Sequence, residues 1–187
     1  MSSFSCDFMK DDNKEIITLA EAKEEMEVAM TRLALMHLSF SKILVDEFGK
    51  EKGRELILKA ITEYGSRIGK IIKAGGRDLP KFGVHTGEVY QTEEGDYVVS
   101  GCVLAKVFKQ YDELELGSLY CYVDPSKSMS ADISEKLIHK TCEACGDDKC
   151  TLAIVPTSEE DKKHFNERSK DLIFLNPYIA KKHLNDE

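Results

Sequence analysis

One uninterrupted helical pattern near the N-terminus constrains the fold more than any other feature of this sequence. Apolar side chains recur at three- and four-residue intervals from Leu19 to Phe48, which is the period of one face of an α-helix. The motif TLAE at residues 18–21 is a capping box at its start, and Gly49 is a typical residue to end it. A helix of this length would span about 45 Å. It would serve either as the spine of the domain or as half of a dimer interface.

A second helical pattern follows at once, in residues 52–74. Gly53, Gly65 and Gly69 lower its intrinsic stability, so we expect that these glycines allow a close approach to a neighbouring element. A pair of glycines then stops the helix, and residues 77–88 are predicted to form a loop. The two helices are expected to form an antiparallel hairpin.

The second half of the chain has a mixed pattern. Residues 97–108 (YVVSGCVLAKVF) are apolar and β-branched enough for a buried strand, and residues 112–125 read as a short helix that runs into a turn at YCYVD. Residues 135–145 and 150–155 are predicted to pair as a hairpin around GDDK. Ser158 is a helix cap, and the tail after Pro177 is polar. We therefore predict one α+β domain over residues 16–187, with long N-terminal helices packed on an antiparallel sheet, after a loose segment at residues 1–15.

Composition narrows the classes of function. The formal charge of −8 opposes binding to nucleic acid or to an anionic membrane. No continuous apolar run approaches the roughly 20 residues of a membrane span, and the first residues lack the pattern of a secretory signal. We therefore expect a cytoplasmic protein with neither nucleic-acid nor membrane partners. In a reducing cytosol its six cysteines would be thiols, metal ligands or catalytic groups rather than disulfides.

Three of these cysteines lie close together in TCEACGDDKCTL, residues 141–152. If the two predicted strands pair around GDDK, alternation places Cys145 opposite Cys150, with His139 on the same face. Cys142 would then point to the other face. On this geometry Cys145 and Cys150 form a thiol pair from which Cys142 is excluded.

A metal site is the competing interpretation of the same residues. CEACG has the form of a tight turn in which Cys142 and Cys145 hold one zinc ion, with Cys150 as a third ligand. The fourth ligand would be Cys121 or His139. Ordinary packing of the cysteines and a catalytic or redox thiol remain open beside this zinc site.

A second candidate site is YCYVD, residues 120–124. A cysteine nucleophile acts as the thiolate, which forms at neutral pH only beside a proton acceptor or a positive charge. Asp124 follows Cys121 by three residues, and His139 is the nearest histidine along the chain. Alternatively, Cys121 and Tyr122 belong to the core and Asp124 caps a turn before proline.

Taken together, these motifs resemble the L-2-amino-thiazoline-4-carboxylic acid hydrolase-like family over residues 16–156. The resemblance lies in the long capped helix, FGKEKGRELILKAITEYGSRIG at 48–69, LYCYVDP at 119–125 and TCEACGDDKCTL at 141–152. Its most specific parts are C-x-x-D at 121–124 and G-D-x-x-C at 146–150. The family is itself similar to the 4-vinyl reductase small-ligand domain.

The resemblance implies helices packed on an antiparallel sheet, pairing of two copies through the helical face, and a pocket for a small molecule. It also implies hydrolytic opening of a C–N or C–S bond at a cyclic amidine-like carbon. The expected catalytic residues are Cys121, Asp124, His139 and Cys150, and the expected ligand-binding residues are His85, Cys102 and Tyr120. We expect no cofactor, with zinc on Cys142, Cys145 and Cys150 as the alternative. The alternative function is a non-catalytic sensory module that binds a small ligand, and in either case we expect a homodimer.

Overall fold

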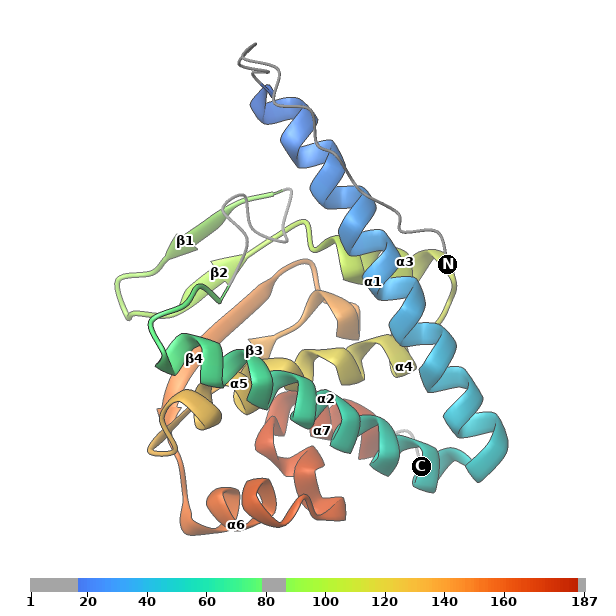
Figure 1. The fold of residues 1–187 in the computed structure, drawn as a ribbon, viewed down its shortest axis with the longest axis vertical. Coiled ribbons are helices and arrows are strands. Elements are labelled where there is room, and N and C mark those ends of the chain that lie inside the picture. Colours follow the sequence, from blue (N-terminus) through green and yellow to red (C-terminus); the bar gives the residue numbers. More distant parts are fainter. Residues whose placement is uncertain (1–16, 79–86, 185–187) are drawn as a thin grey trace, which may run out of the picture.

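The computed structural model describes residues 17–78 and 87–184 (Figure 1). The predicted loose segment at residues 1–15 and His85 lie outside this described part. The helical elements are α1 (Leu19–Phe48), α2 (Lys50–Lys73), α3 (Val103–Gln110), α4 (Leu114–Ser118), α5 (Val123–Ala131), α6 (Glu159–Glu167) and α7 (Pro177–Leu184), with 3₁₀ turns η1 (Leu119–Tyr122), η2 (Glu143–Cys145) and η3 (Lys170–Leu175). The strands are β1 (Val89–Gln91), β2 (Tyr97–Val99), β3 (Glu135–Thr141) and β4 (Cys150–Pro156).

The two long N-terminal helices begin and end as the sequence predicts. The capping box is present: the backbone N–H of Thr18 donates to Glu21 Oε2 at 2.8 Å, and the N–H of Glu21 donates to Thr18 Oγ1 at 3.2 Å. Gly49, with φ of 79°, forms the corner between α1 and α2. Figure 1 shows that α2 leaves this corner across the body of the molecule, so the two helices form an open V rather than a tight antiparallel hairpin.

The glycines of α2 allow the close approach that their positions predict. A Cβ atom on Gly65 would lie 2.7 Å from the Cβ of Ser126 on α5, and one on Gly69 would meet the carbonyl oxygen of Lys127. The hydroxyl of Ser130 donates to the Ser66 carbonyl at 3.0 Å across the same interface. Because no other residue fits between these backbones, α2 fixes the position of α5, which carries Asp124.

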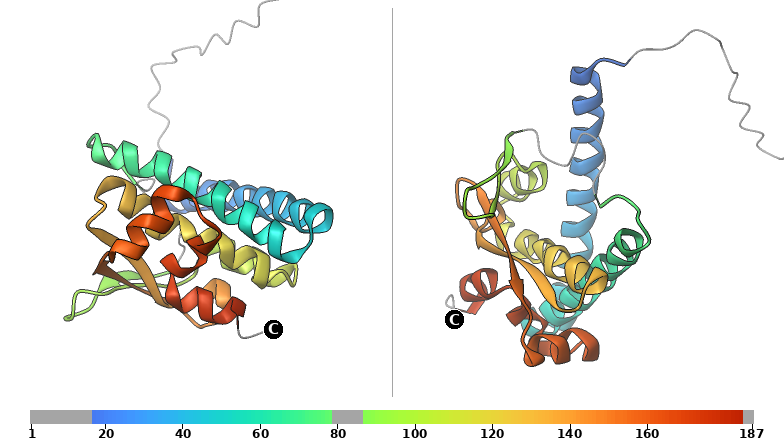
Figure 2. Two further views of the ribbon diagram at one scale, coloured as in Figure 1. Left: turned by 90° about the horizontal axis from the view of Figure 1, so that it is seen from below. Right: turned by 90° about the vertical axis from the view of Figure 1, so that its left-hand side faces the viewer.

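The four strands form one antiparallel sheet in the order β1-β2-β4-β3. Helix α5 packs against both β3 and α2, so the N-terminal helices reach the sheet through α5 (Figures 1 and 2). The predicted α+β class, with long N-terminal helices and an antiparallel sheet, is confirmed.

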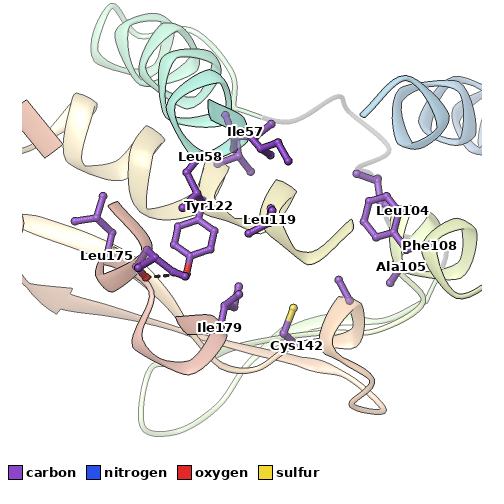
Figure 3. Close-up of a cluster of buried hydrophobic side chains, with 14 of the residues drawn as sticks. Ile57, Leu58, Leu104, Ala105, Phe108, Leu119, Tyr122, Cys142, Leu175 and Ile179 are labelled. Carbon is purple, nitrogen blue, oxygen red and sulfur yellow. Dashed lines mark hydrogen bonds between the residues drawn. The ribbon is translucent and has the colours of Figure 1, made fainter. Parts of the chain in front are cut away.

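The core lies where the helices, the sheet and the C-terminal segment meet (Figure 3). Tyr122 and Phe108 are its largest fully buried side chains, and the Tyr122 hydroxyl donates to the Ile173 carbonyl at 2.7 Å. This bond satisfies a polar group that would otherwise cost about 1–3 kcal/mol to bury. Cys142 lies at the edge of the same cluster, with no exposed surface.

Three predicted segments have a different secondary structure. Residues 97–108 are not one strand, because Gly101 adopts φ of 72° and the apolar residues after it follow the helical period of α3. The predicted turn at YCYVD is helical: η1 continues into α5, whose first turn accommodates Pro125. The tail after Asn176 forms α7, which buries Ile179 and Ala180 despite its polar composition.

Helix α1 is long and apolar enough to cross a membrane, judged by length and composition alone. Its most apolar 18-residue window has a mean hydropathy of 1.4, and 22% of that window is buried. Met36, Phe40 and Ile43 are each more than half exposed. One such helix does not distinguish a membrane span from a face that binds protein, so the absence of a membrane partner stays a prediction.

Candidate functional site

The cysteine hairpin adopts a different register from the predicted one. In the β3–β4 ladder His139 pairs with Leu152 and Thr141 pairs with Thr151, with an irregularity between them. Strand β3 ends at Thr141, and Cys150 pairs with Val99 of β2 on its other side. Cys145 therefore does not lie opposite Cys150 in the ladder, and that prediction is wrong.

A local turn is the physical reason for this difference. The Asp147 carboxylate accepts the backbone N–H of Cys142 at 2.7 Å, and the N–H groups of Cys145 and Asp147 both donate to the Cys142 carbonyl. Gly146 completes the turn with φ of 92°. These bonds satisfy the backbone groups that would otherwise extend the ladder, so the chain leaves the sheet directly after Thr141.

The turn brings Cys142 to Cys121 rather than away from the site. Their Sγ atoms are 3.7 Å apart, and a nitrogen of His139 lies within 4.8 Å of both. The three residues come from η1, from β3 and from the segment after it. The prediction that Cys142 points away from the thiols and His139 is therefore wrong, whereas Cys121 and His139 are brought together as expected.

His139 is buried, with 3% of its surface exposed, and Asn176 fixes its ring. The Asn176 side-chain oxygen accepts the backbone N–H of His139 at 3.4 Å, and its Nδ2 lies 2.9 Å from His139 Nδ1. With the amide in this orientation, Nδ1 is an acceptor and the ring proton is on Nε2. Nε2 is therefore the ring nitrogen left for the sulfurs and for Asp124.

Asp124 lies on the Nε2 side of this imidazole. Its Oδ2 is 3.7 Å from His139 Nε2, and its Oδ1 is 2.9 Å from Lys127 Nζ. Lys127 also contacts Asp78 at 2.9 Å. Burial opposes the charge of this lysine, but the two carboxylates raise the pKa of Lys127, so the ammonium stays charged and holds Asp124 in place.

The hydrogen bonds among the sulfurs shift the pKa values of the three thiols in different directions. A hydrogen bond from Cys142 lowers the pKa of Cys121, and burial opposes that shift; His139 lowers it further. The pKa of Cys150 is also lowered, by Cys142 first, against burial, and then by His139 and the Glu143 N–H, which lies 3.3 Å from its sulfur. Because Cys142 is the donor in these bonds, its own pKa is raised well above the usual value.

The same contacts act on the histidine. Burial lowers the pKa of His139, but its hydrogen bonds to Cys121 and Cys150 and the charge of Asp124 outweigh burial and raise it well above the usual value. The raised pKa favours the imidazolium, with protons on both ring nitrogens, whereas the bond from Asn176 Nδ2 to Nδ1 favours the neutral ring with its proton on Nε2. In both forms Nε2–H faces the sulfurs and Asp124. The arrangement is thus a proton-bearing imidazole between a carboxylate and two thiols that favour the thiolate.

The remaining predicted residues surround this centre. Burial raises the pKa of Cys102 to about 12, so this thiol stays protonated. The backbone N–H of Cys102 donates to Glu143 Oε2 at 3.1 Å, and the second oxygen of Glu143 is buried with no hydrogen-bond partner among the described residues. Tyr120 stacks edge-on against His37 at 5.4 Å between ring centroids, one residue before Cys121.

Cys121, His139 and Cys142 form a group that could hold a metal ion. Of the predicted zinc ligands, this set contains Cys142 and both candidates for the fourth ligand, Cys121 and His139, but neither Cys145 nor Cys150. A surface depression of about 390 Å³ also lies in this region, but Thr141 and residues 146–149 of the hairpin loop line it, without Cys121, His139 or Asp124.

Sequence reasoning missed two residues that organise the centre, Asn176 and Lys127. Asn176 precedes Pro177, and this pair signals the start of a helix; nothing in it indicates a contact with a histidine 37 positions earlier. Lys127 is three residues after Asp124, and within a helix that spacing does predict the ion pair.

Comparisons with protein-family models, with curated proteins and with solved structures found no match for this chain. The resemblance to the thiazoline carboxylate hydrolase-like family therefore stays a prediction based on its motifs.

Proposed function

We propose that this protein is a hydrolase of a small heterocycle or amide, with Cys121 as its nucleophile. The observation that carries the proposal is the sequence of contacts from Cys121 to His139 and from His139 Nε2 to Asp124 at 3.7 Å. A thiol and a carboxylate thus lie beside Nε2 of one imidazole, whose Nδ1 is held by Asn176, so a proton carrier stands next to the proposed nucleophile. The motifs shared with the thiazoline carboxylate hydrolase-like family support the same assignment.

Cys121 is a better nucleophile than Cys150 because it keeps part of its surface exposed. Cys150 is 7% exposed and its sulfur accepts the Glu143 N–H. Cys150 would instead be a second thiolate of the centre, and its sulfur would accept a hydrogen bond from His139. Asp124, held by Lys127, would orient His139 and stabilise its positive charge when the ring takes up a second proton.

The proposed reaction adds one water to the substrate. The Cys121 thiolate attacks the amidine carbon and forms a C–S bond; the ring bond from that carbon to nitrogen or sulfur then breaks. The leaving atom takes a proton from Nε2 of the doubly protonated His139, which becomes a neutral imidazole. Water, deprotonated by His139, attacks the same carbon and the Cys121 thiolate leaves, which restores the enzyme.

Turnover of 2-amino-thiazoline-4-carboxylate by purified variants tests this proposal. We expect Cys121→Ser to lower kcat/KM at least about 100-fold, because an unactivated hydroxyl replaces the thiolate. Cys6→Ser, in a cysteine outside the described residues, is the matched control and should keep full activity. Wild-type protein that releases no product from thiazoline carboxylates, or a Cys121→Ser variant with normal turnover, contradicts the proposal.

A zinc centre is the second candidate, and the distance between two sulfurs favours it. Two thiolates bound tetrahedrally at about 2.3 Å from one zinc ion lie about 3.8 Å apart. The Cys121–Cys142 distance of 3.7 Å is close to this value. In this case Cys121, His139 and Cys142 would hold the ion, and the protein would be a zinc-stabilised module that binds a small ligand.

Elemental analysis separates this candidate from the hydrolase. A zinc centre predicts about one zinc per chain, lost in Cys142→Ala and retained in the matched Cys145→Ala variant. If zinc is retained in both variants, these ligands are wrong. If the purified and folded protein contains no metal, the zinc centre is excluded while the thiol hydrolase remains to be tested by turnover.

A further inference from the structure

The contact between Cys121 and Cys142 has a second chemical consequence. Their sulfurs are 3.7 Å apart, although the residues are 21 positions apart in the sequence. A disulfide has a sulfur–sulfur distance of about 2.05 Å, so the atoms would have to approach by about 1.7 Å. Closing the bond therefore requires the two side chains to move toward each other.

The two cysteines differ in their access to solvent. Cys121 is partly exposed, whereas Cys142 has no exposed surface. An oxidant that diffuses to this part of the protein therefore meets Cys121 first. Oxidation-sensitive cysteines are typically accessible thiolates beside a second thiol that can react with the oxidised form.

We propose that Cys121 and Cys142 form a reversible redox pair, in which a hydroperoxide oxidises Cys121 and Cys142 converts the product to a disulfide. Formation of the disulfide requires only the contact between the two sulfurs. Its effect on turnover rests on the proposed function, because the disulfide withdraws the proposed nucleophile.

The reaction balances in two steps. The Cys121 thiolate attacks the O–O bond of hydrogen peroxide; the sulfur is oxidised to sulfenic acid, and hydroxide leaves. The Cys142 thiol then attacks the sulfenic sulfur, the S–S bond forms and water is released. Overall, two thiols and one hydrogen peroxide give one disulfide and two waters, and an added dithiol reverses the oxidation.

The neighbouring cysteines are less suited to this reaction with Cys121. Cys150 is buried and its sulfur accepts the Glu143 N–H at 3.3 Å. Cys102 is the first residue before α3, and its backbone is held by Glu143. Among the described cysteines, Cys142 is the one with a sulfur contact to Cys121 short enough to count as a hydrogen bond.

Trypsin separates the relevant cysteines, so peptide mapping identifies the bond directly. Cleavage after lysine places Cys121 in residues 110–127, Cys142 and Cys145 in residues 141–149, and Cys150 in residues 150–162. The full-length protein is treated with a chelator and then with hydrogen peroxide, and its free thiols are blocked before digestion. We expect peptide 110–127 to be joined to peptide 141–149, with Cys145 still carrying the blocking group.

Alkylation of Cys121 should fall at least about tenfold after peroxide and return after dithiothreitol. The linkage should persist in Cys145→Ser. In Cys142→Ser it should disappear, and Cys121 should oxidise further to the sulfinic acid. A bond to peptide 150–162, a bond between Cys142 and Cys145, or the absence of any linkage in wild-type protein would overturn the proposal. Because mapping does not depend on turnover, failure of the redox pair and failure of the hydrolase are distinguishable.

Discussion

The two long helices meet at one glycine corner but are used in opposite ways. Helix α2 is pressed against α5, where Gly65 and Gly69 leave no room for a side chain. Helix α1 keeps Phe40 and Ile43 largely in solvent. Because α5 carries Asp124 and follows directly on Cys121, the α2–α5 interface determines the geometry of the site. The exposed face of α1 contributes nothing to that geometry and is available to a partner.

The largest expected effect follows from filling the tight interface. Gly65→Val would place its Cβ 2.7 Å from the Cβ of Ser126, so α5 would have to move away from α2. We expect it to lower the free energy of unfolding by about 3 kcal/mol. The comparison variant on α1, Phe40→Ala, should change it by less than about 0.5 kcal/mol. Urea unfolding measures both, and equal losses would show that the two helices are not used differently.

A smaller loss is expected from Asn176, which links α7 to the site. Asn176→Leu removes the partners of two buried groups of His139, its backbone N–H and its Nδ1. Leaving such groups unsatisfied costs about 1–3 kcal/mol in the free energy of unfolding. Asn176 is also proposed to keep the proton of His139 on Nε2, next to Cys121. If so, iodoacetamide should react with Cys121 at a different rate in the folded variant than in the wild type. An unchanged rate would limit Asn176 to a structural role.

The contrast between the helices also explains what could be predicted from the sequence. Capping boxes, the 3.6-residue period and helical glycines act within a few residues, so α1, α2 and α6 could be predicted, α1 and α6 together with their caps. The thiol site depends on contacts between distant segments. The motifs YCYVD and GDDKC drew attention to Cys121, Asp124 and Cys150. Alternation along a strand failed for Cys142, because the bond from its N–H to Asp147 ends β3 early. No local signal indicated that Asn176 would reach His139.

Helix caps give a finer test of the same contrast, because two capping boxes stand in different surroundings. Ser158 caps α6, whose Asp161 is also paired with buried Lys136. Thr18 caps the end of α1 that projects from the body in Figure 1. Ser158→Ala should lower the free energy of unfolding by about 1 kcal/mol. Thr18→Ala should instead speed hydrogen exchange in the first turns of α1 with little effect on global unfolding.

The smallest effect on the fold is expected when charged residues replace apolar residues on the exposed face of α1. This change also tests most directly what that face binds. We propose that this face, with Met36, Phe40 and Ile43, pairs with a second copy of the chain; the length of the helix and its exposed apolar side chains support this proposal. Phe40→Glu with Ile43→Lys should halve the mass measured by analytical ultracentrifugation and leave the helical circular dichroism unchanged, because neither side chain belongs to the core. The matched change Glu24→Lys with Lys23→Glu, near the start of the helix, should leave the dimer intact.

A wild-type protein that sediments as a monomer at micromolar concentration excludes the dimer. If the same protein pellets with lipid vesicles and the charged variant does not, the apolar face binds a membrane instead, and the predicted absence of a membrane partner is wrong.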